Sequence, residues 1–236
     1  MSENREYIVY NYSFRFKDDK VLTFPVRLDS KTLNIVIEKK ESYPLWTLLE
    51  NDKCTNCPLD PTENQFCPIA VSLVDLINFF KDSVSYETVE VQIQTHDRNF
   101  WKELSLQQGI SSLIGIYMVT SGCPHLEKLK PMVRFHLPFA TPAETTYRAV
   151  SMYLTAQYLK HTSGLKPDWD MSGLVKIYNE IETVNICFAK RLRNIEIKDA
   201  SVNAVAILSC FGDFVKLSVT KDMLSDMKND FRVLME

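Results

Sequence analysis

The sequence predicts an α+β protein in which a small antiparallel amino-terminal sheet packs on a carboxy-terminal helical bundle. In the first part of the chain, apolar and polar residues alternate, which is the period of a half-buried strand. From residue 106 onward, apolar residues recur every three or four positions, as on amphipathic helices. The 236 residues contain no repeat and no long Gly/Pro linker. We therefore expect one compact unit over 1–236, sheet-rich at 1–105 and helical at 106–236.

Three alternating runs, at 7–16, 22–28 and 33–37, predict an antiparallel meander with one buried face. Pro25 lacks an N–H donor, so its strand is expected at an edge or a bulge. A further alternating run at 86–95 is assigned to the same sheet.

Helical spacing begins after an irregular segment at 43–66. Thr141-Pro142-Ala143-Glu144 has the capping Thr, the first-turn Pro and the Glu of a strong helix start, and Gly164 is a stop for that helix. The expected helices cover 69–80, 106–117, 142–163, 174–192, a segment after Asp199, and a more polar segment at 221–234.

Composition excludes some classes of partner. The net charge is −3, with 27 basic and 30 acidic residues, which gives no electrostatic footprint for nucleic acid. The amino terminus lacks the apolar core of a signal peptide, and the apolar stretch at 110–119 is too short to span a bilayer. We therefore expect a cytoplasmic protein with no membrane or nucleic-acid partner.

Cysteine residues give the sequence its one distinctive chemical feature. Cys54 and Cys57 form a Cys-x2-Cys pair, Cys67 follows ten residues later, and Cys123 lies far along the chain. In a reducing cytosol, clustered cysteines are more often metal-binding or redox-active than disulfide-bonded. The other two, Cys187 and Cys210, stand among apolar residues of expected helices and are interpreted as core.

Proline follows Cys57, Cys67 and Cys123 directly, which suits a loop wrapped around a metal. Cys67 precedes a predicted helix, and Gly122-Cys123-Pro124-His125 also resembles a helix start. A sulfur at a helix N-terminus faces unpaired N–H groups, which lower its pKa and favour thiolate. Thiolate is the form that binds a metal.

We therefore predict a metal site at Cys54, Cys57, Cys67 and Cys123, holding zinc or an iron–sulfur cluster. The pattern is incomplete, because a zinc ribbon has two Cys-x2-Cys pairs. His125 or His136 is the alternative fourth ligand. A reversible Cys54/Cys57 dithiol and inert packing are the competing interpretations.

Other polar residues have structural explanations. Arg134 and His136 lie in an apolar stretch and are expected to be a hydrogen-bonded pair. Glu144 and Arg148, four residues apart, are expected to pair on the surface. The carboxylates of Pro167-Asp168-Trp169-Asp170 suit a loop that caps the next helix. No P-loop, GxGxxG, HExxH or Ser-His-Asp pattern is present.

Several motifs resemble an uncharacterised bacterial family of unknown function. They are Cys-Thr-Asn-Cys-Pro-Leu, Phe-Cys-Pro-Ile-Ala, Gly-Ile-Tyr-Met-Val-Thr-Ser-Gly-Cys-Pro, Met-Val-Arg-Phe-His-Leu-Pro-Phe-Ala-Thr and Pro-Asp-Trp-Asp. The resemblance covers nearly the whole chain. It implies a bacterial cytoplasmic protein and no particular activity.

These observations favour a non-enzymatic metal-binding protein with a structural or sensing site. The alternatives are a thiol redox enzyme or sensor using Cys54 and Cys57, and a helical interaction module without metal. The helical part is also the expected surface for a homo-oligomer or a protein partner.

Overall fold

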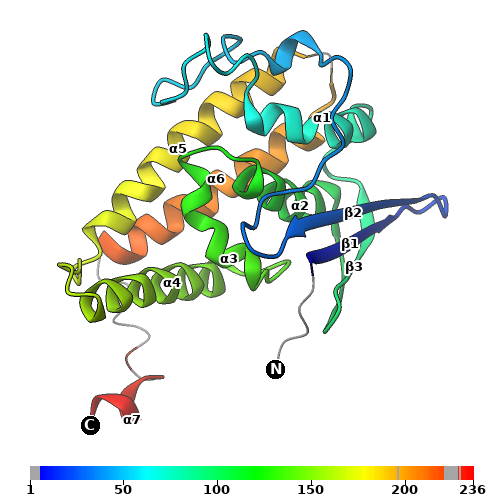
Figure 1. Ribbon diagram of the computed structural model, residues 1–236. Helices are drawn as coiled ribbons and strands as arrows, with labels where there is room; N and C mark the ends of the chain where they lie inside the picture. The colour runs from blue at the N-terminus through cyan, green and yellow to red at the C-terminus, as the bar shows by residue number, and fades with distance from the viewer. Residues whose placement is uncertain (1–5, 196, 221–227, 229) are drawn as a thin grey trace.

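The computed structural model describes residues 6–195, 197–220, 228 and 230–236. Four antiparallel strands form one sheet in the order β2-β1-β3-β4 (Figure 1). Their bounds are β1 Tyr7–Arg15, β2 Val21–Asp29, β3 Thr88–Gln94 and β4 Asn99–Ser105. The predicted α+β class, with the sheet in the amino-terminal part, is confirmed.

The alternating residues of β1 build the buried face of the sheet. Tyr10, Tyr12 and Phe14 are at most 4% exposed, whereas Asn11 and Arg15 face solvent. Successive strand residues point to opposite faces, so this pattern sets which face meets the helices. Pro25 lies opposite Asn11 on the edge strand β2, where its missing donor costs no ladder bond.

The sheet differs from the prediction at two places. Residues 33–37 form no strand, since the chain turns at Asp29 and only Ile35 makes a single bridge, to Leu28. The main-chain N–H of Ile35 instead donates to the carbonyl of Thr120 at the end of a helix. The fourth strand, β4, was not predicted. It is an edge strand with weak alternation, and Trp101 on it is 62% exposed.

Helices make up most of the remaining chain. They are α1 Pro68–Phe80, α2 Leu106–Thr120, α3 Lys130–Arg134, α4 Pro142–Thr162, α5 Ser172–Arg193, α6 Ala200–Thr220 and α7 Arg232–Met235, with 3₁₀ turns η1 Leu45–Thr47 and η2 Leu126–Leu129. Figure 1 shows α5 and α6 running side by side, with α4 below them and α1 above the sheet. The expected helix at 221–234 lies mostly outside the described residues. Within them, the short helix α7 coincides with the end of that range.

The helix α2 connects the sheet with the bundle. A Cβ on Gly109 would lie 2.9 Å from both Phe14 Cε1 and Val91 Cγ2, so only glycine lets α2 approach the strands this closely. On its other side α2 packs along α6, which in turn contacts α4 and α5. The same core therefore includes residues from both the sheet and the helices.

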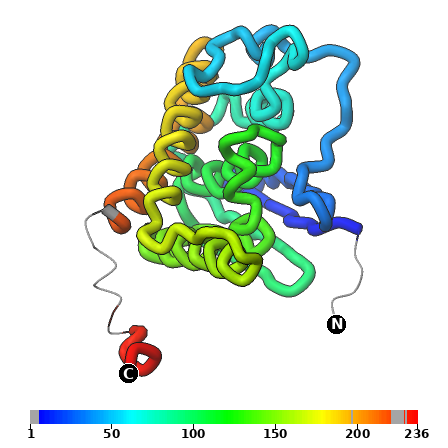
Figure 2. The backbone as a smooth tube through the Cα atoms, turned by 60° about the vertical axis from the view of Figure 1, so that its left-hand side comes forward, coloured from blue at the N-terminus to red at the C-terminus, as the bar shows by residue number. Residues whose placement is uncertain are grey.

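The segment between β2 and α1 runs over one end of the bundle. In Figure 2 this blue-to-cyan stretch crosses the top of the molecule and reaches the end of α5. Residues 43–66 are irregular apart from η1, as predicted. Three of the six cysteines lie in or directly after this segment.

The helix α6 is long and apolar enough to cross a membrane, by length and composition alone. Only 22% of its apolar window within Ala200–Val219 is buried.

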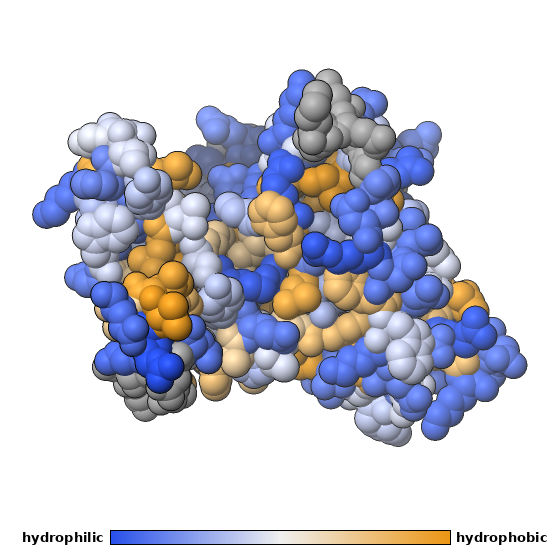
Figure 3. Space-filling view, turned by 90° about the horizontal axis from the view of Figure 1, so that it is seen from below, coloured by the Kyte–Doolittle hydropathy of each residue, from blue (hydrophilic) through white to orange (hydrophobic). Residues whose placement is uncertain are grey.

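Cys210 on this helix is exposed, so the expectation of a core cysteine is wrong there. Figure 3 views the molecule from below and shows hydrophobic residues in separate groups among hydrophilic ones.

Candidate metal centre

A buried arginine holds the cysteine-bearing loop against α5. Arg191 is 2% exposed, and its Nη1 donates to the carbonyls of Trp46 at 2.7 Å and Leu48 at 2.6 Å. Its Nη2 lies 3.4 Å from the carbonyl of Leu49. A planar guanidinium has five donors in a fixed fork, so one side chain can hold three carbonyls of the loop backbone. This contact places residues 46–49 at the carboxyl end of α5.

Two further residues fasten the loop along the same helix. Asp52 accepts from Asn194 Nδ2 at 2.6 Å and pairs with Lys190 at 2.8 Å. Asn56 Nδ2 donates to the main-chain carbonyl of Glu180, about three turns further towards the start of α5. The loop therefore lies along α5 over much of its length.

The Cys54–Cys57 pair forms a tight turn within this loop. The N–H of Cys57 donates to the carbonyl of Cys54 at 3.0 Å, which closes a four-residue turn over 54–57. Both residues are half-buried and pack against the main core.

Cys67 is the N-cap residue of α1, as predicted. Its own N–H donates to the carbonyl of Thr47 at 2.8 Å, which joins the helix start to the loop. The side chain is 7% exposed, and the main-chain N–H groups of Ile69 and Ala70 point at its sulfur. These are the unpaired donors of a helix N-terminus.

Cys123 follows Gly122, whose φ of +94° turns the chain sharply after α2. It precedes the 3₁₀ turn η2 and not a full α-helix, but its surroundings are similar. The N–H groups of His125 and Leu126 point at its sulfur, and the side chain is 8% exposed. Both helix-start cysteines thus place a sulfur among backbone donors.

His125 joins two of the cysteine segments. Its Nε2 lies 2.7 Å from the carbonyl of Asn56, and its Nδ1 lies 3.1 Å from Glu180 Oε2. Because both ring nitrogens already contact protein oxygen atoms, this imidazole has no nitrogen left for a metal in the described arrangement. In this arrangement His125 clamps the loop at Asn56 to the segment that follows Cys123.

The four predicted cysteines are close enough to influence one another. Burial is the main cause that raises the pKa of Cys54, and the charges of four other cysteines raise it further: Cys187, Cys67, Cys57 and Cys123. Cysteines from the loop, from α1 and from η2 therefore lie within electrostatic range of Cys54, in or against the same hydrophobic core. Cys187, on α5, joins this group, although the sequence had suggested an ordinary core residue.

The expected lowering of the thiol pKa is wrong for the two helix-start cysteines. Burial raises the pKa of Cys67 and of Cys123, and this effect outweighs the N–H groups that point at each sulfur. Desolvation disfavours the charged form of any acid, and here it exceeds the stabilisation by backbone donors. Burial therefore favours the neutral thiol at both positions.

In the described part of the chain, no three His, Cys, Asp or Glu side chains stand in an arrangement that could hold a metal ion. The cysteine sulfurs are gathered without sharing one coordination sphere. Coordination by Cys54, Cys57, Cys67 and Cys123 therefore requires their side chains to turn towards a common point.

His136, the other alternative ligand, lies in a different place. Its Nε2 is 2.7 Å from the Tyr12 hydroxyl and 3.3 Å from Ser112 Oγ. Burial, with a smaller contribution from the nearby Arg148 charge, lowers the pKa of His136 to about 3. The ring is a neutral, half-buried bridge between β1 and α2.

The remaining polar candidates are structural. Arg134 donates to the carbonyl of Ser30 and does not pair with His136. Arg148 donates to the carbonyls of Met132 and Phe135, whereas Glu144 caps its own helix through Thr141.

Asp168 accepts hydrogen bonds from the Tyr153 hydroxyl and from the N–H of Gly173 in the first turn of α5. The predicted capping role of this loop is confirmed.

No curated protein and no solved structure matches the chain. Residues 9–232 match the model of a domain of unknown function, DUF6901, and this covers most of the chain. The protein belongs to the DUF6901 family.

Proposed function

We propose that Cys54, Cys57, Cys67 and Cys123 bind a thiophilic metal, either zinc or an iron–sulfur cluster, in a non-enzymatic protein. The observation that carries this proposal is that cysteines from three separate segments belong to or pack against one hydrophobic core, within electrostatic range of Cys54. In the proposed metal-bound form, the metal joins the irregular loop at 43–66 to the start of α1 and to η2. Its role is structural or sensing.

The surroundings suit thiolate ligands. Backbone N–H groups of residues 69, 70, 125 and 126 point at two of the sulfurs. Arg191 adds a buried positive charge that lowers the pKa of Cys67. No carboxylate forms an ion pair with Arg191 within the described residues, so its charge is available to offset thiolate charge. Such second-sphere groups are typical of sulfur-ligated metals.

The raised thiol pKa values count against the alternative of a thiol redox enzyme. A nucleophilic cysteine needs a lowered pKa, because the thiolate is the attacking form. Burial and neighbouring cysteines shift Cys54 in the opposite direction. A metal overcomes the same effect, because coordination itself removes the thiol proton.

The helical interaction module without metal depends on the molecular surface. A protein-binding surface is expected to expose a large continuous apolar patch. On the one face shown in Figure 3, hydrophobic residues lie in separate groups, whereas the apolar helix α6 is buried over only 22% of its most apolar window.

Metal analysis of protein purified without oxygen tests the proposal. We expect about one zinc ion per chain, or iron with acid-labile sulfide and a visible absorbance band, since four thiolates complete one tetrahedral zinc site or one cluster. The two results distinguish the metals. A stoichiometry near zero, with all four thiols alkylated in the native protein, contradicts the proposal.

Single variants identify the ligands. Cys67→Ser and Cys123→Ser are expected to lose the metal, whereas Cys210→Ser, which changes an exposed cysteine on α6, keeps it. Cys187→Ser decides whether the fifth cysteine belongs to the set. If Cys187→Ser loses the metal and Cys123→Ser retains it, the proposed ligand set is wrong.

A further inference from the structure

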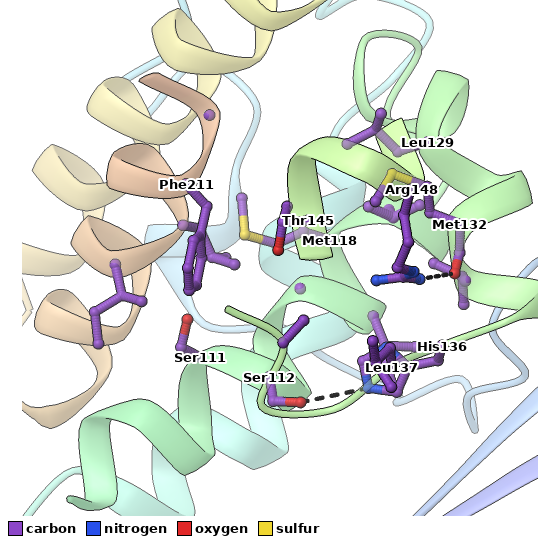
Figure 4. A pocket seen from close by; sticks show the side chains of 18 of the residues that line it. Ser111, Ser112, Met118, Leu129, Met132, His136, Leu137, Thr145, Arg148 and Phe211 are labelled. Carbon is purple, nitrogen blue, oxygen red and sulfur yellow. Dashed lines mark hydrogen bonds between the residues drawn. The ribbon is translucent and has the colours of Figure 1, made fainter. Parts of the chain in front are cut away.

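A cavity that is partly open to the surface lies among the helices, and no cysteine lines it. Its volume is about 310 Å³, and residues from α2, α4, α5, α6 and the segment around α3 line it. Most of the lining side chains are apolar, including Met118, Met132 and Phe211 (Figure 4). Natural ligand sites are concave and mainly apolar, with a few placed polar groups.

One buried polar side chain in the lining has no hydrogen-bond partner among the described residues. Ser111 is 2% exposed, and its Oγ is unpaired. Figure 4 shows this hydroxyl directed from α2 towards Phe211 of α6. Buried polar groups are normally paired, so an unpaired hydroxyl beside the cavity indicates space that a bound molecule fills.

The charged side chains in the lining indicate which chemical class of ligand the cavity suits. Arg148 extends into it from α4, and its Nη2 is held by the carbonyls of Met132 and Phe135 (Figure 4). The exposed Lys102 of β4 also lines the cavity, and no Asp or Glu is among the lining residues. The remaining guanidinium N–H groups can form a bidentate pair with a carboxylate.

Size limits the ligand further. An engineered cavity of roughly 150 Å³ holds one benzene molecule, so twice that volume suits about a dozen non-hydrogen atoms. An unbranched carboxylic acid of this size has an apolar chain for the Met and Phe side chains and one anionic group for Arg148.

We propose that this cavity binds a medium-chain fatty acid, with its carboxylate on Arg148 and its chain between α2 and α6. The site is independent of the cysteine centre, because none of its lining residues is a cysteine. Neither proposal depends on the other.

Calorimetric titration of the full chain with decanoate tests the assignment. We expect saturable binding of one decanoate, and at least tenfold weaker binding of decan-1-ol, which has the same chain without the charge. No saturable heat with decanoate, or equal affinity for acid and alcohol, contradicts the proposal.

A pair of substitutions at one position locates the site. Ser111→Leu fills the cavity, so it is expected to abolish decanoate binding while the melting temperature stays at or above that of the wild type. Ser111→Ala removes the hydroxyl without filling the space and is expected to retain binding. Unchanged binding in folded Ser111→Leu places the fatty acid elsewhere and overturns the proposal.

Arg148→Met tests the charge. It is expected to weaken decanoate binding at least tenfold and to leave decan-1-ol binding unchanged. Since this variant also removes donors from Met132 and Phe135, methionine methyl spectra of the wild type provide a second test. Decanoate should shift the methyl signals of Met118 and Met132, which line the cavity. The methyl signal of Met235, which is 67% exposed, should not change. Shifts at Met235 alone contradict the site.

Discussion

His125 Nε2 donates a hydrogen bond of 2.7 Å to the main-chain carbonyl of Asn56. This bond joins the residue before Cys57 to the residue two positions after Cys123, although the two cysteines are far apart in the sequence. The same ring contacts Glu180 on α5, so three segments meet at one side chain. The relative positions of the loop and η2 therefore depend on this histidine.

Replacing His125 with Ala should weaken metal binding. The variant keeps all proposed ligands but releases Asn56, so we expect zinc affinity to fall about tenfold, as for other second-sphere residues. Competition with a chromophoric chelator measures this. His96→Ala, in the exposed turn between β3 and β4, is the control and should bind zinc as the wild type does. Equal affinity in both variants would show that the clamp is irrelevant to the site.

The stability of the metal-free protein should depend on pH in the alkaline range. Burial raises the folded-state pKa of Cys54, Cys67 and Cys123 above the ordinary value of 9.0. Above that pH the unfolded chain releases thiol protons that the folded chain keeps, so unfolding becomes more favourable as pH rises.

We therefore expect that these thiols do not change the free energy of unfolding of the metal-free protein below about pH 8. Above about pH 9, their titration should lower it. Urea titrations across this range measure it. The triple variant with Ser at these three positions should lose the dependence. A free energy of unfolding that rises above pH 9 in the metal-free wild type contradicts the prediction.

Arg191→Met should destabilise the fold strongly. The change leaves the carbonyls of Trp46 and Leu48 without their donor, and buried unpaired acceptors are costly, so we expect a loss of about 2–4 kcal/mol. Urea unfolding measures the loss. Arg193→Met is the matched control, because Arg193 is exposed on the same helix. Similar values for the two variants would mean that the loop does not depend on Arg191.

Two glycines of α2 should respond in opposite directions to alanine. Gly109→Ala places a methyl group 2.9 Å from Phe14 and Val91 within the core, and overpacking of this kind costs about 1–3 kcal/mol. Gly115→Ala meets only Leu208, at an ordinary 3.4 Å, and gains helix propensity of roughly 0.5–1 kcal/mol. Thermal unfolding distinguishes them. A stabilising Gly109→Ala would show that the helix can move away from the sheet.

Strong periodicity was the reliable signal for the fold. The residues Tyr10, Tyr12 and Phe14 alternate without interruption, and β1 is buried on that face. The run at 33–37 has the same alternation, but Ile35 bonds to the end of α2, a contact between segments that no local pattern reveals. The edge strand β4 was missed because an exposed edge needs no apolar face.

The candidate site was predictable in part. The Cys-Pro motifs drew attention to Cys67 and Cys123, and the helix pattern gave the capping position of Cys67. Arg191 was overlooked, although a signal existed: it lies three residues after Phe188 and seven after Val184, on the buried stripe of α5. The effect of burial on the thiol pKa could not be predicted, because desolvation depends on the packing of distant segments.

Because the loop lies along α5, fragments of the chain cannot keep all of its contacts. A fragment ending at residue 105 would carry three of the proposed ligands, yet the partners of Trp46, Asp52 and Asn56 would all be missing. The complementary fragment would hold only Cys123 of the proposed four. Neither piece contains the whole proposed ligand set, so a peptide mimic of the Cys-x2-Cys motif is expected to reproduce little of the metal binding proposed for the intact chain.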